Sequence, residues 1–162
     1  MSTPEFHEIP RAVAALHALG VSHAATRFPP AGSLTEAAAM RGVTPADIVK
    51  TMVVRRGEDD YVFVLLGGDS EISWPKLRAL LGVSRLSMPS AQVALAATGY
   101  PRGAITPFGA LHAWPVVADA AIVGREVSMG GGEHGLAIFV TADDVIAALG
   151  AQVADIAGPS LP

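Results

Sequence analysis

The sequence predicts an α+β fold, a single domain in which helices surround a mixed or antiparallel β-sheet or a partly closed barrel. The 162 residues are 51% hydrophobic and 16% charged, which suits one compact domain with a substantial core. Helical and strand patterns follow one another without the regular βαβ rhythm of a doubly wound nucleotide-binding fold. No internal repeat or linker divides the chain, so residues 1–157 are assigned to one domain and 158–162 to a short tail.

Predicted helices carry a capping residue or an early proline at their start, or a glycine after their end. Thr44 is an expected cap, with Pro45 in the first turn and Asp47 near the positive end of the helix dipole. Thr141 and Asp144 resemble a capping box. The predicted helices cover 11–20, 34–41, a short segment from 44, 73–81, 90–97 and 141–150.

Predicted strands are short runs rich in β-branched and aromatic residues, bounded by turn signals. The runs at 50–56 and 61–66 flank the charged turn GEDD and predict a β-hairpin. The runs at 125–129 and 136–140 are joined by GGGEHG and predict a second hairpin. Shorter strands are expected at 116–118 and in the late segment QVADI.

Lys50 interrupts the apolar run IVKTMVV at the point where helix gives way to strand. A charge in a buried strand needs a partner or a function. Two glycine-rich segments follow downstream, GYPRGAITPFG at 99–109 and GGGEHG at 130–135, and glycine lets backbone amides approach a ligand closely. Together these features suggest an anionic or ester-bearing ligand. The structural alternatives are a strand-end lysine whose stem covers apolar surface, and glycines that serve only turn geometry.

Several classes of function lose support from the residues alone. Cysteine is absent, which excludes disulfides, thiolate nucleophiles and sulfur-ligated zinc. The five histidines lack metal-ligand spacing, and no phosphate loop, HExxH, GxSxG elbow or strand-linked GxGxxG is present. We therefore expect neither a metal site nor a cofactor.

The charge pattern limits the expected partners and location. A net charge of −4 argues against broad adhesion to nucleic acid, including duplex DNA, without excluding recognition of a nucleic-acid end. Charged residues break every apolar stretch before it reaches the ~20 residues of a membrane span. The N-terminal segment lacks the pattern of a secretory signal, so we expect a soluble, cytoplasmic protein without a membrane partner.

Five segments in combination resemble one known family. They are IVKTMVV, GDSEISWPKLRALLG, TGYPRGAITPFG with its GxxxP loop at 103–107, GGGEHG, and the closing ADI. With these segments the chain resembles, over nearly its whole length, the bacterial YbaK-type aminoacyl-tRNA deacylases, which are related to the editing domain inserted in many prolyl-tRNA synthetases. The resemblance implies an α+β fold and hydrolysis of amino acids wrongly attached to a tRNA, often that of proline.

The resemblance also implies site residues. Lys50 matches the lysine that the family needs for activity. The GxxxP loop matches the substrate-positioning loop, the glycine-rich turn matches the segment that faces it, and Phe108 is either a pocket wall or a core aromatic. The family turn often reads GAGERG, so this turn is expected to act mainly through its backbone. The candidate substrate-binding residues are Gly103, Ala104, Ile105, Thr106, Pro107, Phe108, Gly130, Gly131, Gly132, Glu133 and His134.

The function implied is trans-editing, the hydrolysis of tRNA-Pro mischarged with a small amino acid such as Cys, Ala, Ser or Thr. The partners implied are the acceptor end of an aminoacyl-tRNA and prolyl-tRNA synthetase. Loop amides would hold the ester or its oxyanion, while Lys50 either neutralises the phosphate or ribose region or polarises the ester and orients water. The alternative is a non-catalytic module that binds an aminoacyl-tRNA end, an amino acid or a nucleotide.

Overall fold

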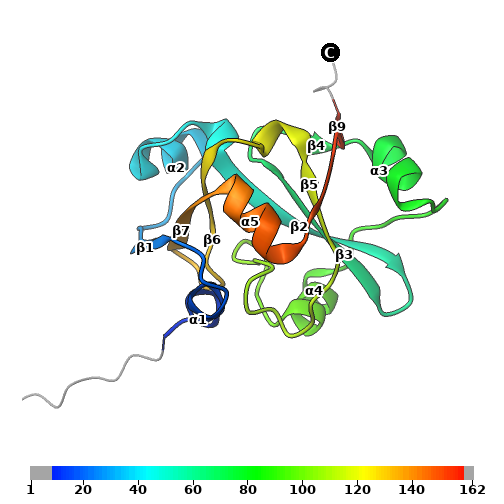
Figure 1. The fold of residues 1–162 in the computed structure, drawn as a ribbon, viewed down its shortest axis with the longest axis horizontal. Coiled ribbons are helices and arrows are strands. Elements are labelled where there is room, and N and C mark those ends of the chain that lie inside the picture. Colours follow the sequence, from blue (N-terminus) through cyan, green and yellow to red (C-terminus); the bar gives the residue numbers. More distant parts are fainter. Residues whose placement is uncertain (1–8, 159–162) are drawn as a thin grey trace, which may run out of the picture.

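The computed structural model describes residues 9–158, and Figure 1 shows how their elements are arranged. The helices are α1 (Arg11–Ala18), α2 (Leu34–Arg41), the 3-10 turn η1 (Pro45–Asp47), α3 (Trp74–Leu81), α4 (Ala91–Thr98), the 3-10 turn η2 (Ala120–Ile122) and α5 (Ala142–Leu149). The strands are β1 (Ala24–Arg27), β2 (Ile48–Gly57), β3 (Asp60–Gly67), β4 (Glu71–Ile72), β5 (Val116–Asp119), β6 (Glu126–Gly130), β7 (Leu136–Thr141), β8 (Gln152–Ala154) and β9 (Ala157–Gly158). None of the helices in this part of the chain is long and apolar enough to cross a bilayer.

Seven strands form one mixed sheet in the order β1-β7-β6-β2-β3-β5-β8. The pairs β1–β7, β6–β7 and β2–β3 are antiparallel, whereas β2–β6, β3–β5 and β5–β8 are parallel. Strands β1 and β8 are the two edges, so the sheet is open. The predicted α+β fold is confirmed in its mixed-sheet form.

The centre of the sheet is buried on both faces. Alternate residues of β3 point to opposite sides, as strand geometry requires. Helices α1 and α5 cover the face with the larger core, and α3 covers the other (Figure 1). On the larger side lie Tyr61, Phe63 and Leu65, and on the smaller side Val62, Val64 and Leu66.

Both predicted hairpins are present, and most predicted caps form. The hydroxyl oxygens of Ser73, Ser90 and Thr141 each accept a hydrogen bond from a backbone N–H three residues later. The expected cap at Thr44 is wrong: its hydroxyl donates to Asp47 Oδ2 at 2.8 Å instead of accepting from the backbone. The Asp47 N–H, three residues later, donates to the Thr44 carbonyl at 2.9 Å and not to its hydroxyl.

The sequence patterns missed three short strands. Strand β1 is exposed along its length and pairs with β7, so it carries no apolar alternation. Strands β4 and β9 have two residues each and pair only with one another, across more than eighty positions of sequence. Strand β2 begins at Ile48, two residues earlier than predicted.

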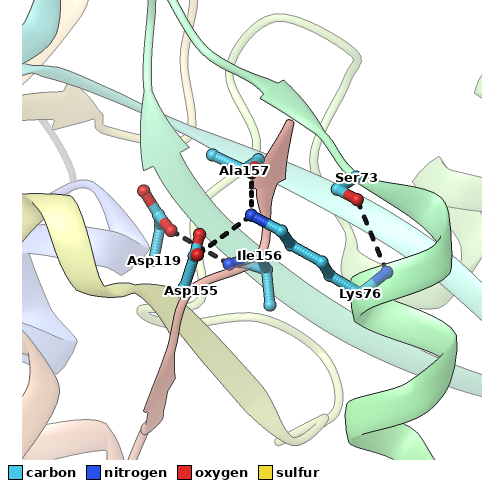
Figure 2. A network of polar contacts seen from close by, with 6 residues as sticks. All are labelled: Ser73, Lys76, Asp119, Asp155, Ile156 and Ala157. Carbon is cyan, nitrogen blue, oxygen red and sulfur yellow. Dashed lines mark hydrogen bonds and ion pairs between the residues drawn. The ribbon is translucent and has the colours of Figure 1, made fainter. Parts of the chain in front are cut away.

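A polar network holds the end of the described chain against α3 (Figure 2). The buried Asp119 accepts from the Ile156 N–H at 3.2 Å. Lys76 Nζ donates to Asp155 Oδ2 at 2.9 Å and to the Ala157 carbonyl at 3.0 Å. The closing ADI segment is therefore anchored by side chains from two other elements, and Lys76 has a structural role.

The predicted tail at 158–162 lies almost wholly outside the described residues. Its first residue, Gly158, pairs with Glu71 as part of β9. Strand pairing thus extends one residue beyond the predicted domain boundary.

Asp47 connects η1 to the start of β6. Its carboxylate accepts hydrogen bonds from Arg125 Nη1 at 2.9 Å and from the Thr44 hydroxyl at 2.8 Å. The bond from Arg125, followed by that from Thr44, holds the pKa of Asp47 below its usual value. Because the folded-state pKa is lowered, these contacts stabilise the fold above pH about 4, and this stabilisation disappears as the pH falls through the lowered pKa.

Asp47→Asn is therefore expected to reduce the free energy of unfolding by up to about 1 kcal/mol near neutral pH, because the contact with Arg125 is partly exposed. The difference from wild type should narrow as the pH is lowered toward about 2, where the wild-type carboxyl is also protonated. Urea unfolding across this pH range measures the difference in the free energy of unfolding. A destabilisation that is constant with pH would contradict the role assigned to the Arg125–Asp47 contact.

Candidate functional site

A cleft opens where two parallel strands of the sheet separate. Strands β2 and β6 share only two residue pairs, Ile48 with Ser128 and Val49 with Met129. Beyond them lies a cleft of about 280 Å³, lined by β2, by residues at and before α4, by the 102–105 segment and by Gly130. This volume is at the small end of the range for ligand pockets, so the cleft suits a small group.

Lys50 lines this cleft from β2. Its side chain is partly buried, and Nζ lies 3.4 Å from the Gly68 carbonyl oxygen, a long hydrogen bond. No carboxylate within residues 9–158 lies at ion-pair distance from it. The Lys50 charge thus lies at the cleft, and no carboxylate of residues 9–158 neutralises it.

Two arginines that the sequence did not single out join Lys50 in the cleft. Arg41, from the end of α2, donates to the Ser128 hydroxyl at 3.1 Å, and burial lowers the pKa of its guanidinium below its usual value. Arg102 precedes the GxxxP loop and also lines the cleft. Since the lining contains three cationic and no acidic side chains, the cleft favours anionic or electron-rich groups although the chain carries a net charge of −4.

Hydrogen bonds inside the GxxxP loop limit which of its amides can face a ligand. The Ala104 N–H donates to the Pro101 carbonyl at 3.0 Å, and Pro107 has no N–H. Thr106 is buried and does not line the cleft. Gly103 and Ile105 do line it, and their N–H groups make no hydrogen bond within the described chain. The candidate oxyanion donors are therefore reduced to two.

The two glycine-rich segments pack directly on each other. The Gly132 N–H donates to the Ala104 carbonyl at 2.9 Å. A Cβ atom added to Gly130 would lie 3.4 Å from the Ile105 carbonyl oxygen, and one added to Gly103 would lie 3.7 Å from His134 Cε1. The turn thus faces the loop, as the resemblance implies, and supports it mainly through backbone contacts.

Several candidate residues are not brought to the cleft. Phe108 is 2% exposed and packs in the larger core, because its side chain lies on the buried side of the loop. Glu133 forms an exposed ion pair with Arg27 at 2.9 Å. Of the candidate set, Lys50, Gly103, Ile105 and Gly130 line the cleft, whereas Ala104, Thr106, Pro107, Phe108, Gly131, Gly132, Glu133 and His134 do not.

Tyr100 holds the base of the loop and was not anticipated. Its hydroxyl donates to the Phe108 carbonyl at 2.6 Å, and the Arg11 guanidinium lies 5.1 Å from its ring centroid while donating to the Gly109 carbonyl. Burial raises the pKa of Tyr100, although the Arg11 charge acts in the opposite direction. A tyrosine beside a Pro-Arg-Gly turn gives no local signal of this role, which depends on the distant α1.

Known proteins resemble this chain in sequence and in structure. The family model of the aminoacyl-tRNA editing domain matches residues 29–148. The chain belongs to this family. A solved structure of a protein proposed to be a trans-editing enzyme for prolyl tRNA synthetase superposes with a TM-score of 0.85 at 26% identity, covering 98% of this chain and 100% of that one. A hypothetical protein of solved structure gives 0.84 at 26% identity, covering 91% and 99%.

Related sequences are found within larger proteins. The proline–tRNA ligase of Heliobacterium modesticaldum is 32% identical over 122 residues, which cover 75% of this chain and 20% of the ligase. That of Geobacter sp. (strain M21) is 35% identical over 112 residues, 65% of this chain and 19% of the ligase. The chain spans about a fifth of the length of these relatives.

Gly132 provides a test of the contact between turn and loop. It has φ +90°, and a Cβ there would lie 2.5 Å from the Tyr100 ring. Gly124 has φ +79° with nothing within 4 Å, so Gly124→Ala measures backbone strain alone. We expect Gly124→Ala to cost about 1–2 kcal/mol of stability, and Gly132→Ala to cost more because the ring must also move. Equal losses in thermal or urea unfolding would contradict the close packing.

Proposed function

We propose that this protein is a trans-editing aminoacyl-tRNA deacylase, which hydrolyses the ester of tRNA-Pro carrying a small amino acid such as Cys, Ala, Ser or Thr. The observation that carries the proposal is the convergence of Lys50 with the unused amides of Gly103 and Ile105 on one small cationic cleft. Family membership provides the reaction class, and the acceptor end of tRNA is the proposed partner. Prolyl-tRNA synthetase is a second proposed partner, and the cytoplasm the proposed location.

The cleft suits ester hydrolysis without a protein nucleophile. An aminoacyl ester is already activated, so its hydrolysis needs a positioned carbonyl, a stabilised oxyanion and a water. The two amides supply oxyanion donors, a contribution worth about 3 kcal/mol per donor in other enzymes. No carboxylate or imidazole lines the cleft within the described residues, so the proposal assigns activation of the water to a hydroxyl of the substrate.

The cationic side chains fit the chemistry of the acceptor end. Lys50 takes one of two roles: it neutralises the terminal phosphate or ribose region, or it polarises the ester and orients water. Arg41 and Arg102 bring further positive charge to the same cleft. We propose that residues 1–157 act as one editing domain in which this cluster receives the end of the tRNA.

The chain has only two lysines, which makes the test specific. Lys50→Ala is expected to lower multiple-turnover deacylation by about a hundredfold or more, the usual cost of losing a stabilising donor. Lys76→Ala is the matched control, because Lys76 is bonded to Asp155 and does not line the cleft. It should retain deacylation per folded molecule, as checked on tRNAs charged with alanine, cysteine, serine, threonine and proline.

Lys50→Arg separates the two roles of the lysine. Retained activity indicates that charge alone suffices, and lost activity indicates a short-range role. If the wild-type protein binds aminoacyl-tRNA stoichiometrically and releases no amino acid from any member of the panel, the deacylase proposal fails and the binding-module alternative takes its place.

A further inference from the structure

Thr51 is the feature of the cleft that the proposed mechanism leaves unexplained. Its hydroxyl oxygen is buried and has no hydrogen-bond partner, the one such side-chain atom among residues 9–158. Leaving a buried polar group unpaired is costly, and a valine of the same shape would avoid that cost. Thr51 nevertheless lies beside Lys50 and lines the cleft.

Strand geometry places Thr51 on the side of the GxxxP loop. Side chains alternate along a strand, so Thr51 shares a face with Val49 and Val53 and not with Lys50. Val49 and Val53 belong to the larger core, against which Ile105 packs. Lys50 and Thr51 therefore approach the cleft from opposite faces of β2.

The backbone beside Thr51 is also free. Arg55 exchanges both its backbone hydrogen bonds with Ser87, at 2.7 and 3.1 Å, so its N–H and C=O point away from β3. In an antiparallel pair, residues two positions apart direct their backbone groups to the same side. The N–H and C=O groups of Thr51 and Val53 therefore also point away from β3. The Phe63 N–H supports this direction for Val53. It donates to the Pro115 carbonyl and not to Val53, the residue opposite it in β2.

This edge of β2 has no strand beside it in the described part of the chain. Pairing with β6 ends at Val49, and the bridge to Ser87 begins at Arg55. Between them, Thr51 and Val53 line the cleft, and strand alternation directs their carbonyls to this edge, beside the buried Thr51 hydroxyl. These groups are neutral acceptors, whereas the charged side chains of the cleft are all cations that would repel an ammonium group.

We infer that Thr51 is a positioning residue for the aminoacyl group: its hydroxyl, with the free carbonyls of the β2 edge, accepts hydrogen bonds from the substrate α-amino group. A rotation about its Cα–Cβ bond exchanges the hydroxyl with the methyl group and turns the oxygen toward the cleft. The inference rests on the proposed function. It adds a binding site for the α-amino group, which the cationic side chains of the cleft would repel. It leaves the ester carbonyl to the Gly103 and Ile105 amides.

Thr51→Val and Thr51→Ser test this inference by hydrolysis of alanyl-tRNA-Pro and by thermal unfolding. Thr51→Val is expected to lower kcat/KM about tenfold, the effect of one hydrogen bond, while raising Tm by about 2–4 °C. Thr51→Ser keeps the hydroxyl and should keep most of the activity. Thr26→Val, at an exposed position of β1, is the control for replacing a threonine by a valine. It should change neither kcat/KM nor Tm.

A substrate without the amino group tests the assignment to that group. Propionyl-tRNA-Pro has the ester and methyl group of the alanyl substrate but no amine. The wild-type preference for the alanyl ester over the propionyl ester should fall about tenfold in Thr51→Val, because the two changes remove the same interaction. An unchanged preference would overturn the assignment.

Other outcomes are equally decisive. Full activity in Thr51→Val, or equal losses in the valine and serine variants, would overturn the inference while leaving the deacylase intact. A lower Tm in Thr51→Val would show that the hydroxyl is structural. An inactive wild type would overturn the proposed function itself, which distinguishes that failure from failure of the inference.

Discussion

The packing of the GxxxP loop against the glycine-rich turn is the contact on which the site depends. The Gly132 N–H donates to the Ala104 carbonyl, and a Cβ added to Gly130 would be in van der Waals contact with the Ile105 carbonyl oxygen. The chain that continues from β6 is therefore hydrogen-bonded to the loop, while its pairing with β2 ends at Val49. Because the two strands part after Val49, the cleft opens where Lys50 begins, and the edge of β2 stays unpaired. The charged cleft, the loop amides that border it and the free edge of β2 all depend on this separation of the two strands.

The sequence predicted what is determined locally. Both hairpins and the caps of the helices that follow Ser73 and Thr141 depend on residues within a few positions of each other. Lys50 was conspicuous because its neighbours are apolar. Strands β1, β4 and β9 were missed because only distant partners hold them. Tyr100, Arg41 and Arg102 obtain their places from tertiary packing, and a threonine in a strand is too common to attract attention.

The two lysines show how surroundings decide the role of one residue type. Lys76 meets a carboxylate and a carbonyl, and it holds the end of the described chain to α3. Within residues 9–158, Lys50 makes one long hydrogen bond, to the Gly68 carbonyl, and it shares its cleft with two arginines. Together with the unpaired Thr51 hydroxyl, this arrangement forgoes stability that simpler side chains would provide. Such local conflicts are expected where a sequence serves ligand binding and not folding alone.

The groups proposed to hold the reacting ester are largely backbone atoms, whereas the remaining walls of the cleft are side chains such as Met52 and Met88. Methionine side chains are unbranched and adapt to irregular shapes. Substitutions at these walls can change the size of the accommodated group without altering the amides or the strand edge. Exchange of wall residues can therefore change the selectivity of this scaffold while the backbone framework of the cleft stays the same.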